Sequence, residues 1–290
     1  MREHILVCQY HENLINRLHH KQVVVKISDF EKIHPVCKQL NDVQVGLHCL
    51  MIQHNGSIAS IPFHESWKGI PIAIYANEMG TMKELMGRLP LIRDLNIRIF
   101  LNSDLEANFT SLHIMASLGI ECGLYFGNKE KINWELVNDL MTYAIYGKVN
   151  HAPLEPFYHL ASHYNPEQHT DFNSVYFENP LTYLHIDHEE NIAASSEDLD
   201  NKKFIAKGID SLERISENSK YDEAIHAWQQ FFLKPDGCAY CQAWRVCLGK
   251  FSESVKVNEG CKPFFVDMME ACDHFLSMQH KNKKKEVWQP

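Results

Sequence analysis

Long uninterrupted apolar runs are missing from this 290-residue sequence. None approaches the roughly 18 apolar residues that a membrane-spanning helix needs, and the apolar stretch near the N-terminus is too short and too interrupted for a signal peptide. Excess positive charge is also missing, because the net charge is −9. General nucleic-acid binding requires a basic surface that neutralises phosphates. We therefore expect a cytoplasmic protein with no membrane and no nucleic-acid partner.

Several motifs that carry catalysis or bind cofactors are absent too. The sequence contains neither the phosphate-binding pattern G-x-G-x-x-G nor the nucleophile pattern G-x-S-x-G. His159 and His163 lie four residues apart, but the glutamate of H-E-x-x-H does not accompany them. Exposed or hydrogen-bonded histidines are a better interpretation of this pair than a metal site. The sequence therefore points to no catalytic residue.

Short β-branched runs alternate with helical patterns from about residue 20 to residue 146. The predicted strands span 23–27, 43–52, 70–76, 97–102 and 120–126. Such repeated βα units indicate an α/β protein with a parallel sheet. About five units are too few for a closed eight-unit barrel. The pattern predicts an open, partial (β/α) barrel or a doubly wound sheet.

The pattern changes after Gly147, and it predicts three regions. Residues 1–150 form the partial barrel, and residues 151–200 form a connecting helix and a β-hairpin. The polar sequence DHEEN is the expected turn of that hairpin, and His185 and His188 are expected to flank Asp187 in this turn. Residues 201–290 form a cysteine-rich region with a final helix at 262–278.

Cysteines gather in this last region, where the sequence CAYCQAWRVC has the spacing C-x2-C-x5-C. Cys238, Cys241 and Cys247 supply three thiols, and Cys261 is the best fourth; Cys272 competes, but it lies on the apolar face of the final helix. Disulfides are disfavoured in a reducing cytosol and by the odd count of nine cysteines. Four thiolates suit a zinc ion or a [4Fe–4S] cluster. Zinc ribbons usually contain two C-x2-C pairs, so a cluster is favoured over zinc. A chance grouping is disfavoured because a C-x2-C pair with a third and a fourth cysteine is uncommon by chance.

The segment GCAYCQAWRVCLGKF…EGCKPFFVDMMEA resembles the second half of the SPASM domain, the cysteine-rich extension of peptide-maturing radical SAM enzymes. Upstream, the βα units are similar to the partial barrel of that family, and the resemblance covers about residues 20–275. It implies a SPASM-like cluster-binding region at 201–290, in which Trp244 would shield the metal.

Departures from the SPASM pattern are also informative. Phe251 stands where the next family cysteine would be, and Glu190 and Ser195 replace the glycine and cysteine of the family's G-x4-C. In the family these missing cysteines serve the first of two auxiliary clusters. The resemblance therefore implies that one cluster is lost and one is kept.

A radical SAM enzyme also needs C-x3-C-x2-C to bind and cleave S-adenosylmethionine, and this chain has no such motif. Cys8, Cys37 and Cys49 are spaced too widely to form it. The resemblance thus implies a pseudo-radical-SAM accessory protein in ribosomal-peptide modification. It would hold one [4Fe–4S] cluster, bind no S-adenosylmethionine, and bind a precursor peptide or an active maturase. A single-cluster redox enzyme or electron-transfer protein, and a zinc-stabilised binding module, are the alternatives.

Overall fold

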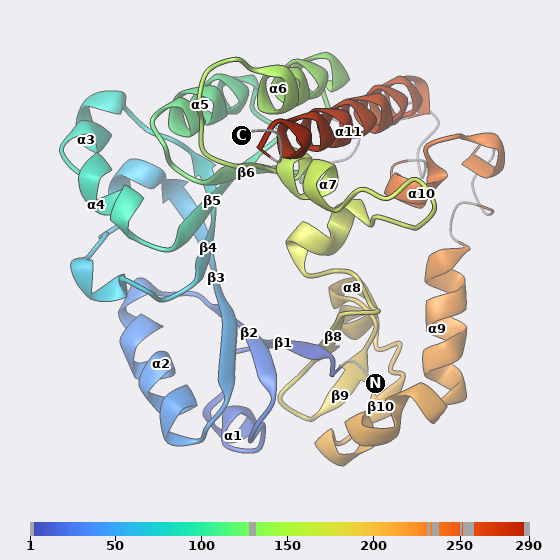
Figure 1. Ribbon diagram of the computed structural model, residues 1–290. Helices are drawn as coiled ribbons and strands as arrows, with labels where there is room; N and C mark the ends of the chain where they lie inside the picture. Colours follow the sequence, from blue (N-terminus) through green and yellow to red (C-terminus); the bar gives the residue numbers. More distant parts are fainter. Residues whose placement is uncertain are drawn as a thin grey trace. The chain divides into compact units, whose positions relative to one another are not determined.

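The computed structural model describes residues 3–127, 132–230, 233, 238–249, 251 and 258–286, and it is an α/β protein with a mostly parallel sheet (Figure 1). Its strands are β1 (Ile5–Gln9), β2 (Gln22–Ile27), β3 (Gly46–Ser57), β4 (Ile72–Glu78), β5 (Ile97–Asn102), β6 (Cys122–Tyr125), β7 (Leu154–Glu155), β8 (Tyr183–Ile186), β9 (Asn191–Ala193) and β10 (Ala206–Lys207). They form one sheet in the order β10-β9-β8-β1-β2-β3-β4-β5-β6-β7. The pairs of β1 with β2 and β8 are parallel, as are β2 with β3 and β3 with β4, whereas β9 pairs antiparallel with β8 and β10. The predicted α/β class is confirmed.

Helices connect and flank these strands. They are α1 (Glu12–Ile15), α2 (Ile33–Asp42), α3 (Met82–Met86), α4 (Leu89–Asp94), α5 (Glu106–Ser117), α6 (Trp134–Tyr146), α7 (Phe157–His163), α8 (Ser196–Asp200), α9 (Ser219–Gln229), α10 (Trp244–Cys247) and α11 (Asn258–Glu286). None of the helices in the described ranges is long and apolar enough to cross a membrane.

Two compact units make up the chain, and each combines two separate segments. The first unit consists of Met1–Phe100 and Tyr176–Gln229, and the second of Leu101–Val175 and Gln230–Pro290. Residues distant in sequence therefore share one core in each unit. All five cysteines of the C-terminal region belong to the second unit.

Strand β2 lies at the centre of the first unit, and its middle residues are fully buried. Val23, Val24 and Val25 on β2 have no exposed surface. A strand buried on both faces has a continuous apolar sequence, as is usual in parallel sheets covered by helices. This property made β2 and β4 recognisable from the sequence.

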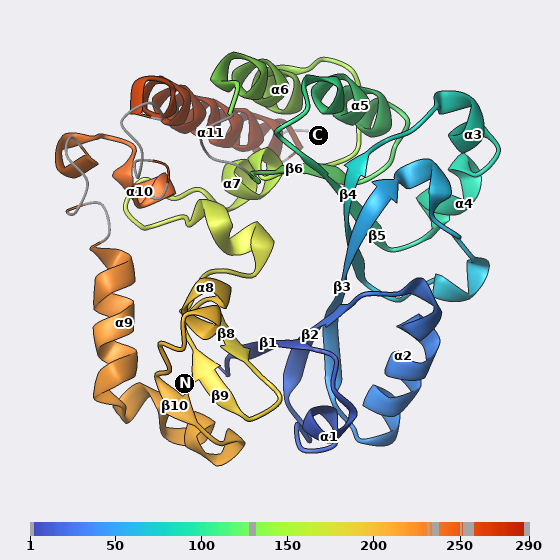
Figure 2. The ribbon, with the colours of Figure 1, turned by 180° about the vertical axis from the view of Figure 1, so that it is seen from behind.

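Two features of the first unit were not predicted. The sequence ILVCQ forms strand β1, and β8 lies parallel beside it, with Leu6 opposite Leu184 (Figures 1 and 2). The predicted hairpin exists as β8 and β9, but His185 is not in its turn. It is a β8 residue with an exposed fraction of 2%. The turn begins one residue after Ile186, because the carboxylate of Asp187 accepts the backbone N–H groups of Glu189 and Asn191.

Burial sets the protonation state of His185. Its Nε2 lies 3.2 Å from the Phe177 carbonyl oxygen and 3.5 Å from a Glu178 carboxylate oxygen. Burial, reinforced by the positive charge of Lys26, lowers the pKa of His185 from 6.5 to about 3, although the Phe177 carbonyl acts in the opposite direction. Desolvation outweighs the nearby carboxylate, so the imidazole is neutral at physiological pH.

Acidification should therefore destabilise the first unit through His185. An unfolded chain binds this proton near pH 6.5, whereas the folded chain does so only near pH 3, so the free energy of unfolding falls as the pH drops below 6.5. At pH 5 we expect His185 to account for a loss of about 2 kcal/mol relative to pH 7. Urea unfolding of wild type and His185→Gln at both pH values measures this difference. On acidification, His185→Gln should lose less stability than wild type. His34→Gln, which changes an exposed histidine, is the control and should lose as much stability as wild type. Equal losses in all three proteins would contradict the prediction.

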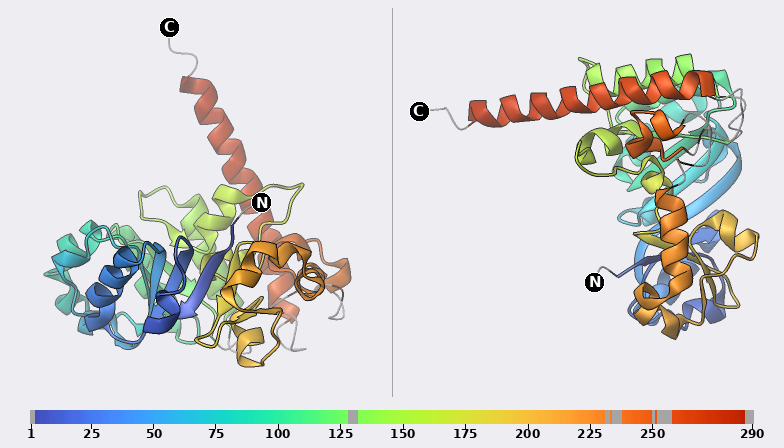
Figure 3. Two further views of the ribbon diagram at one scale, coloured as in Figure 1. Left: turned by 90° about the horizontal axis from the view of Figure 1, so that it is seen from below. Right: turned by 90° about the vertical axis from the view of Figure 1, so that its right-hand side faces the viewer.

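Helices α5, α6, α7 and α11 form the body of the second unit. Helix α6 packs beside α5, α7 and α11, and the C-terminal half of α11 extends beyond α6 (Figure 3). Between these helices lies an aromatic cluster, which we define as Phe126, Trp134, Phe172, Phe251, Phe264 and Phe265. Aromatic side chains bury large apolar areas, so this cluster forms a substantial part of the core of the unit.

Candidate metal centre

The C-x2-C-x5-C segment folds as a series of tight turns. The N–H of Cys241 donates to the carbonyl oxygen of Cys238 at 3.0 Å, and the N–H of Trp244 donates to that of Cys241 at 3.3 Å. Helix α10 then ends at Cys247. Each turn reverses the chain within a few residues, so the three cysteines stay close together.

After Cys247 the backbone enters the left-handed region. Leu248 has a φ of 51° and Gly249 a φ of 78°, and glycine adopts this conformation without a steric penalty. The turn directs the N–H of Gly249 back to the sulfur of Cys247, at 3.4 Å. Backbone hydrogen bonds to sulfur stabilise thiolate character, which is what a metal ligand requires.

Cys261 comes from the first turn of α11, because that helix begins at Asn258, earlier than predicted. Gly260 lies directly against Trp134: an added Cβ would stand 2.2 Å from the indole Cδ1. The missing side chain at Gly260 therefore allows α11 to pack on the aromatic cluster. This packing fixes the position of Cys261.

Four thiols line one small cavity. Cys238, Cys241, Cys247 and Cys261 are all in its wall. The rest of the wall is Gly249, Phe251, Lys262 and Phe265, and the free space at the centre is about 20 Å³, enough for one water molecule. The structure thus brings together the four cysteines that the sequence analysis selected.

Cys272, the competing ligand, does not line this cavity. It lies eleven residues after Cys261 on the same helix, about 16 Å along the axis at 1.5 Å per residue. Burial, with a smaller contribution from Asp273, raises the pKa of the Cys272 thiol to about 12. Its side chain is 1% exposed, and it packs as a small apolar residue.

Trp244 does not shield the thiols as predicted. It packs against His169, with ring centroids 4.8 Å apart, and under the guanidinium of Arg245. The apolar wall is made by Phe251 and Phe265 instead. Phe265 lies four residues after Cys261, on the same face of the helix, so helical periodicity would have identified it. Phe251 carries no comparable signal in the sequence.

Burial keeps the thiols of Cys247 and Cys261 protonated when no cation is present. It raises the pKa of Cys247 to about 12, with further contributions from the three other thiols, while the Gly249 N–H acts in the opposite direction. It also raises the pKa of Cys261 to about 11. A metal centre must displace these protons, because thiolates are the ligands.

A zinc ion and a [4Fe–4S] cluster place different demands on the four thiols. Among the described residues, no group of three or more His, Cys, Asp or Glu side chains has the spacing to hold one metal ion. A zinc ion draws four sulfurs to about 2.3 Å from a common point. A [4Fe–4S] cluster places each thiolate on a different iron, so its four sulfurs stand further apart. Because the centre of the cavity is water-sized, binding a cluster requires the thiol side chains to turn outwards.

Residues at the three positions that depart from the SPASM pattern are held by protein partners. Phe251 is 3% exposed and lies in the aromatic cluster. Glu190 forms an ion pair with Arg17. Ser195 caps α8, accepting the N–H of Asp198 at 3.0 Å. Each of these side chains therefore has a structural role of its own.

The histidine pair on α7 has ordinary hydrogen bonds. The rings of His159 and His163 stack with centroids 4.5 Å apart, and His163 Nδ1 lies 2.9 Å from the His159 carbonyl oxygen. This arrangement agrees with the expectation of hydrogen-bonded histidines.

Comparison with known proteins adds no assignment. The chain matches no protein-family model, and no curated protein matches it.

Proposed function

We propose that this chain is a non-catalytic, pseudo-radical-SAM accessory protein in the modification of ribosomally made peptides. In this proposal Cys238, Cys241, Cys247 and Cys261 hold one [4Fe–4S] cluster. The protein then binds a precursor peptide, an active radical SAM maturase, or both. When bound, the cluster cross-links the four cysteines, which stabilises the C-terminal region, and it can carry a single electron.

One observation carries the proposal: four cysteines from separate turns of the chain line the same small cavity. The order and spacing of these cysteines resemble the second half of the SPASM domain. The mostly parallel sheet is compatible with a partial barrel, which the proposal takes as its finer architecture.

The proposal includes no S-adenosylmethionine chemistry, because the other cysteines are spread over the chain. Cys8 lies on β1, Cys37 on α2 and Cys49 on β3, so the three thiols belong to three different elements. Reductive cleavage needs three cysteines in one tight loop, which leave the fourth iron of their cluster open to the cofactor. The four-cysteine site proposed here has no open position, which suits structure or electron transfer.

Electron transfer to a partner is the second candidate. Tyr240, between the first two cysteines, is 91% exposed, and Cys241 is only partly buried. The C-x2-C turn therefore reaches the surface of the second unit. A cluster held there would be within reach of a docked redox partner.

The purified, reduced protein should form no 5′-deoxyadenosine from S-adenosylmethionine. It should instead increase peptide modification when added to an active radical SAM maturase and the precursor peptide of that maturase. Chromatographic detection of 5′-deoxyadenosine and mass spectrometry of the peptide measure the two results.

Two controls make this experiment decisive. A no-protein control sets the background of 5′-deoxyadenosine, and the maturase with peptide alone sets the basal modification. Formation of 5′-deoxyadenosine above background, lost in Cys238→Ala, would contradict the non-catalytic assignment. Unchanged peptide modification would contradict the accessory role.

A further inference from the structure

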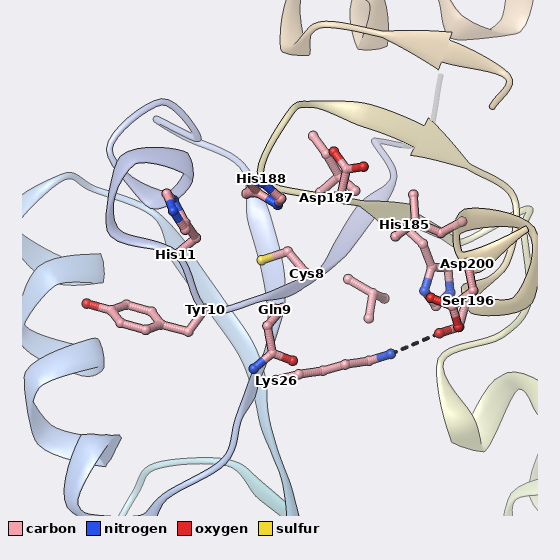
Figure 4. A pocket seen from close by; sticks show the side chains of 13 residues that line it. Cys8, Gln9, Tyr10, His11, Lys26, His185, Asp187, His188, Ser196 and Asp200 are labelled. Carbon is pink, nitrogen blue, oxygen red and sulfur yellow. Dashed lines mark hydrogen bonds between the residues drawn. The ribbon is translucent and has the colours of Figure 1, made fainter. Parts of the chain in front are cut away.

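The first unit contains a larger cavity, of about 350 Å³, at the carboxyl ends of β1 and β8 (Figure 4). Cys8 and Gln9 end β1, and His185 and Ile186 end β8. Ligands of parallel α/β proteins bind beyond the carboxyl ends of the strands. The volume falls within the range of small-molecule sites, about 300–1,000 Å³.

Lys26 is the one cationic side chain with a fixed charge among the described residues that line this cavity. Its ammonium donates to the hydroxyl oxygen of Ser196 at 3.3 Å, as Figure 4 shows. No carboxylate in the described part of the chain pairs with it. Its positive charge lowers the pKa of His185, and it also lowers the pKa of Cys8, which burial raises. The charge of Lys26 therefore acts on residues of both β1 and β8.

Neither acidic residue of the cavity neutralises this charge. The carboxylate of Asp187 accepts the N–H of Glu189 and both the backbone and side-chain N–H groups of Asn191. Asp200 is exposed at the end of α8, where water and salt screen its charge. A partly buried ammonium without a counter-ion favours an anionic ligand.

The remaining wall decides which kind of anion fits. Val7 and Ile186, both almost fully buried, and Leu199 form the apolar part of the wall, and Gln9, Tyr10, His11 and His188 complete it with polar groups. No arginine lines the described cavity, whereas phosphate sites use arginine forks or several backbone N–H groups. One ammonium and one hydroxyl match the charge and hydrogen-bonding capacity of a single carboxylate.

We infer that this cavity binds a carboxylate with a short apolar body, with Lys26 as its counter-ion. The ligand is a free carboxylic acid or the C-terminus of a peptide, since both present the same group. Lys26 and Ser196 hold the carboxylate, and Val7, Ile186 and Leu199 contact the apolar part. The site lies wholly within the first unit, so it stands independently of the cysteine cavity and of the proposed function.

Calorimetric titration with N-acetyl-leucine and N-acetyl-leucinamide tests the inference, because the two probes differ in the charged group alone. The acid should bind and the amide should bind at least tenfold more weakly. Lys26→Met should weaken binding of the acid at least tenfold, and Lys26→Arg should restore part of it. Lys68→Met, which removes an exposed cation of the same unit, should have no effect.

A second measurement needs no variant. N-acetyl-leucine should protect Lys26 of the wild-type protein from reductive methylation, as scored by peptide mass spectrometry, while Lys68 stays reactive. Tighter binding of 4-methylpentanoate would identify a free acid as the source, and tighter binding of a tripeptide ending in leucine would identify a peptide terminus. Equal affinity for acid and amide, or methylation of Lys26 unaffected by the acid, would overturn the inference.

Discussion

Cys238→Ala is expected to remove most of the iron from the anaerobically purified protein and to destabilise the second unit. Wild type should contain about four irons per chain and absorb near 400 nm, as one [4Fe–4S] cluster does. The loss follows because three thiolates remain for a centre that needs four. Metal binding is also folding free energy, so melting of the second unit should move to lower temperature. Iron and sulfide quantitation with thermal unfolding measures both effects.

Cys272→Ala is the matched control, since it removes a buried cysteine from the helix that carries Cys261 without touching the cavity. Its iron content should equal that of wild type. Iron retained in Cys238→Ala, or lost in Cys272→Ala, would contradict the ligand assignment. A colourless protein with one zinc per chain would support the zinc-stabilised module instead, and about eight irons would show a second cluster.

Phe251→Ala is expected to lower the free energy of unfolding of the second unit by about 3–5 kcal/mol, the range for truncating a buried phenylalanine. The Phe251 ring lies 5.3–5.5 Å, between centroids, from the rings of Phe126, Trp134, Phe172 and Phe265. Its removal leaves a cavity inside this cluster, where neighbouring rings are held by other contacts and cannot collapse fully. Phe251 also lines the thiol cavity, so iron retention should fall with stability.

Urea unfolding followed by tryptophan fluorescence measures the change, because Trp134 contacts Phe251 directly. Tyr240→Ala is the control: this ring is 91% exposed, and its loss should alter stability by no more than about 0.5 kcal/mol. A loss below about 1 kcal/mol in Phe251→Ala would show that the aromatic cluster is not a substantial part of the core of the unit.

Local sequence patterns were enough for much of the fold. Runs such as VVVKI predict buried parallel strands, because a strand covered on both faces must be apolar at successive positions. Helix α5 was recognisable between Ser103 and Gly119 because serine is typical of the start of a helix and glycine of its end. These preferences depend only on residues within one turn of the helix end. The ligand set Cys238, Cys241 and Cys247 likewise depends on close spacing along one segment.

Other features depend on segments far apart in the chain, and the tertiary structure alone decided them. The sequence ILVCQ is short enough to be a strand or a loop, and it becomes β1 because β2 and β8 flank it. Cys261 and Cys272 are both apolar-face candidates, and only the packing of Gly260 on Trp134 turns Cys261 towards the other thiols. In the sequence alone, Lys26 is an ordinary strand lysine, and only the tertiary structure places it in one cavity with residues of β8 and α8. The sequence by itself determined the alternating strands and helices of residues 20–146 and the three clustered thiols, since those depend on neighbours within a few residues. The packing of side chains in the core decided which distant elements contact each other. Residue spacing along the chain does not predict these contacts.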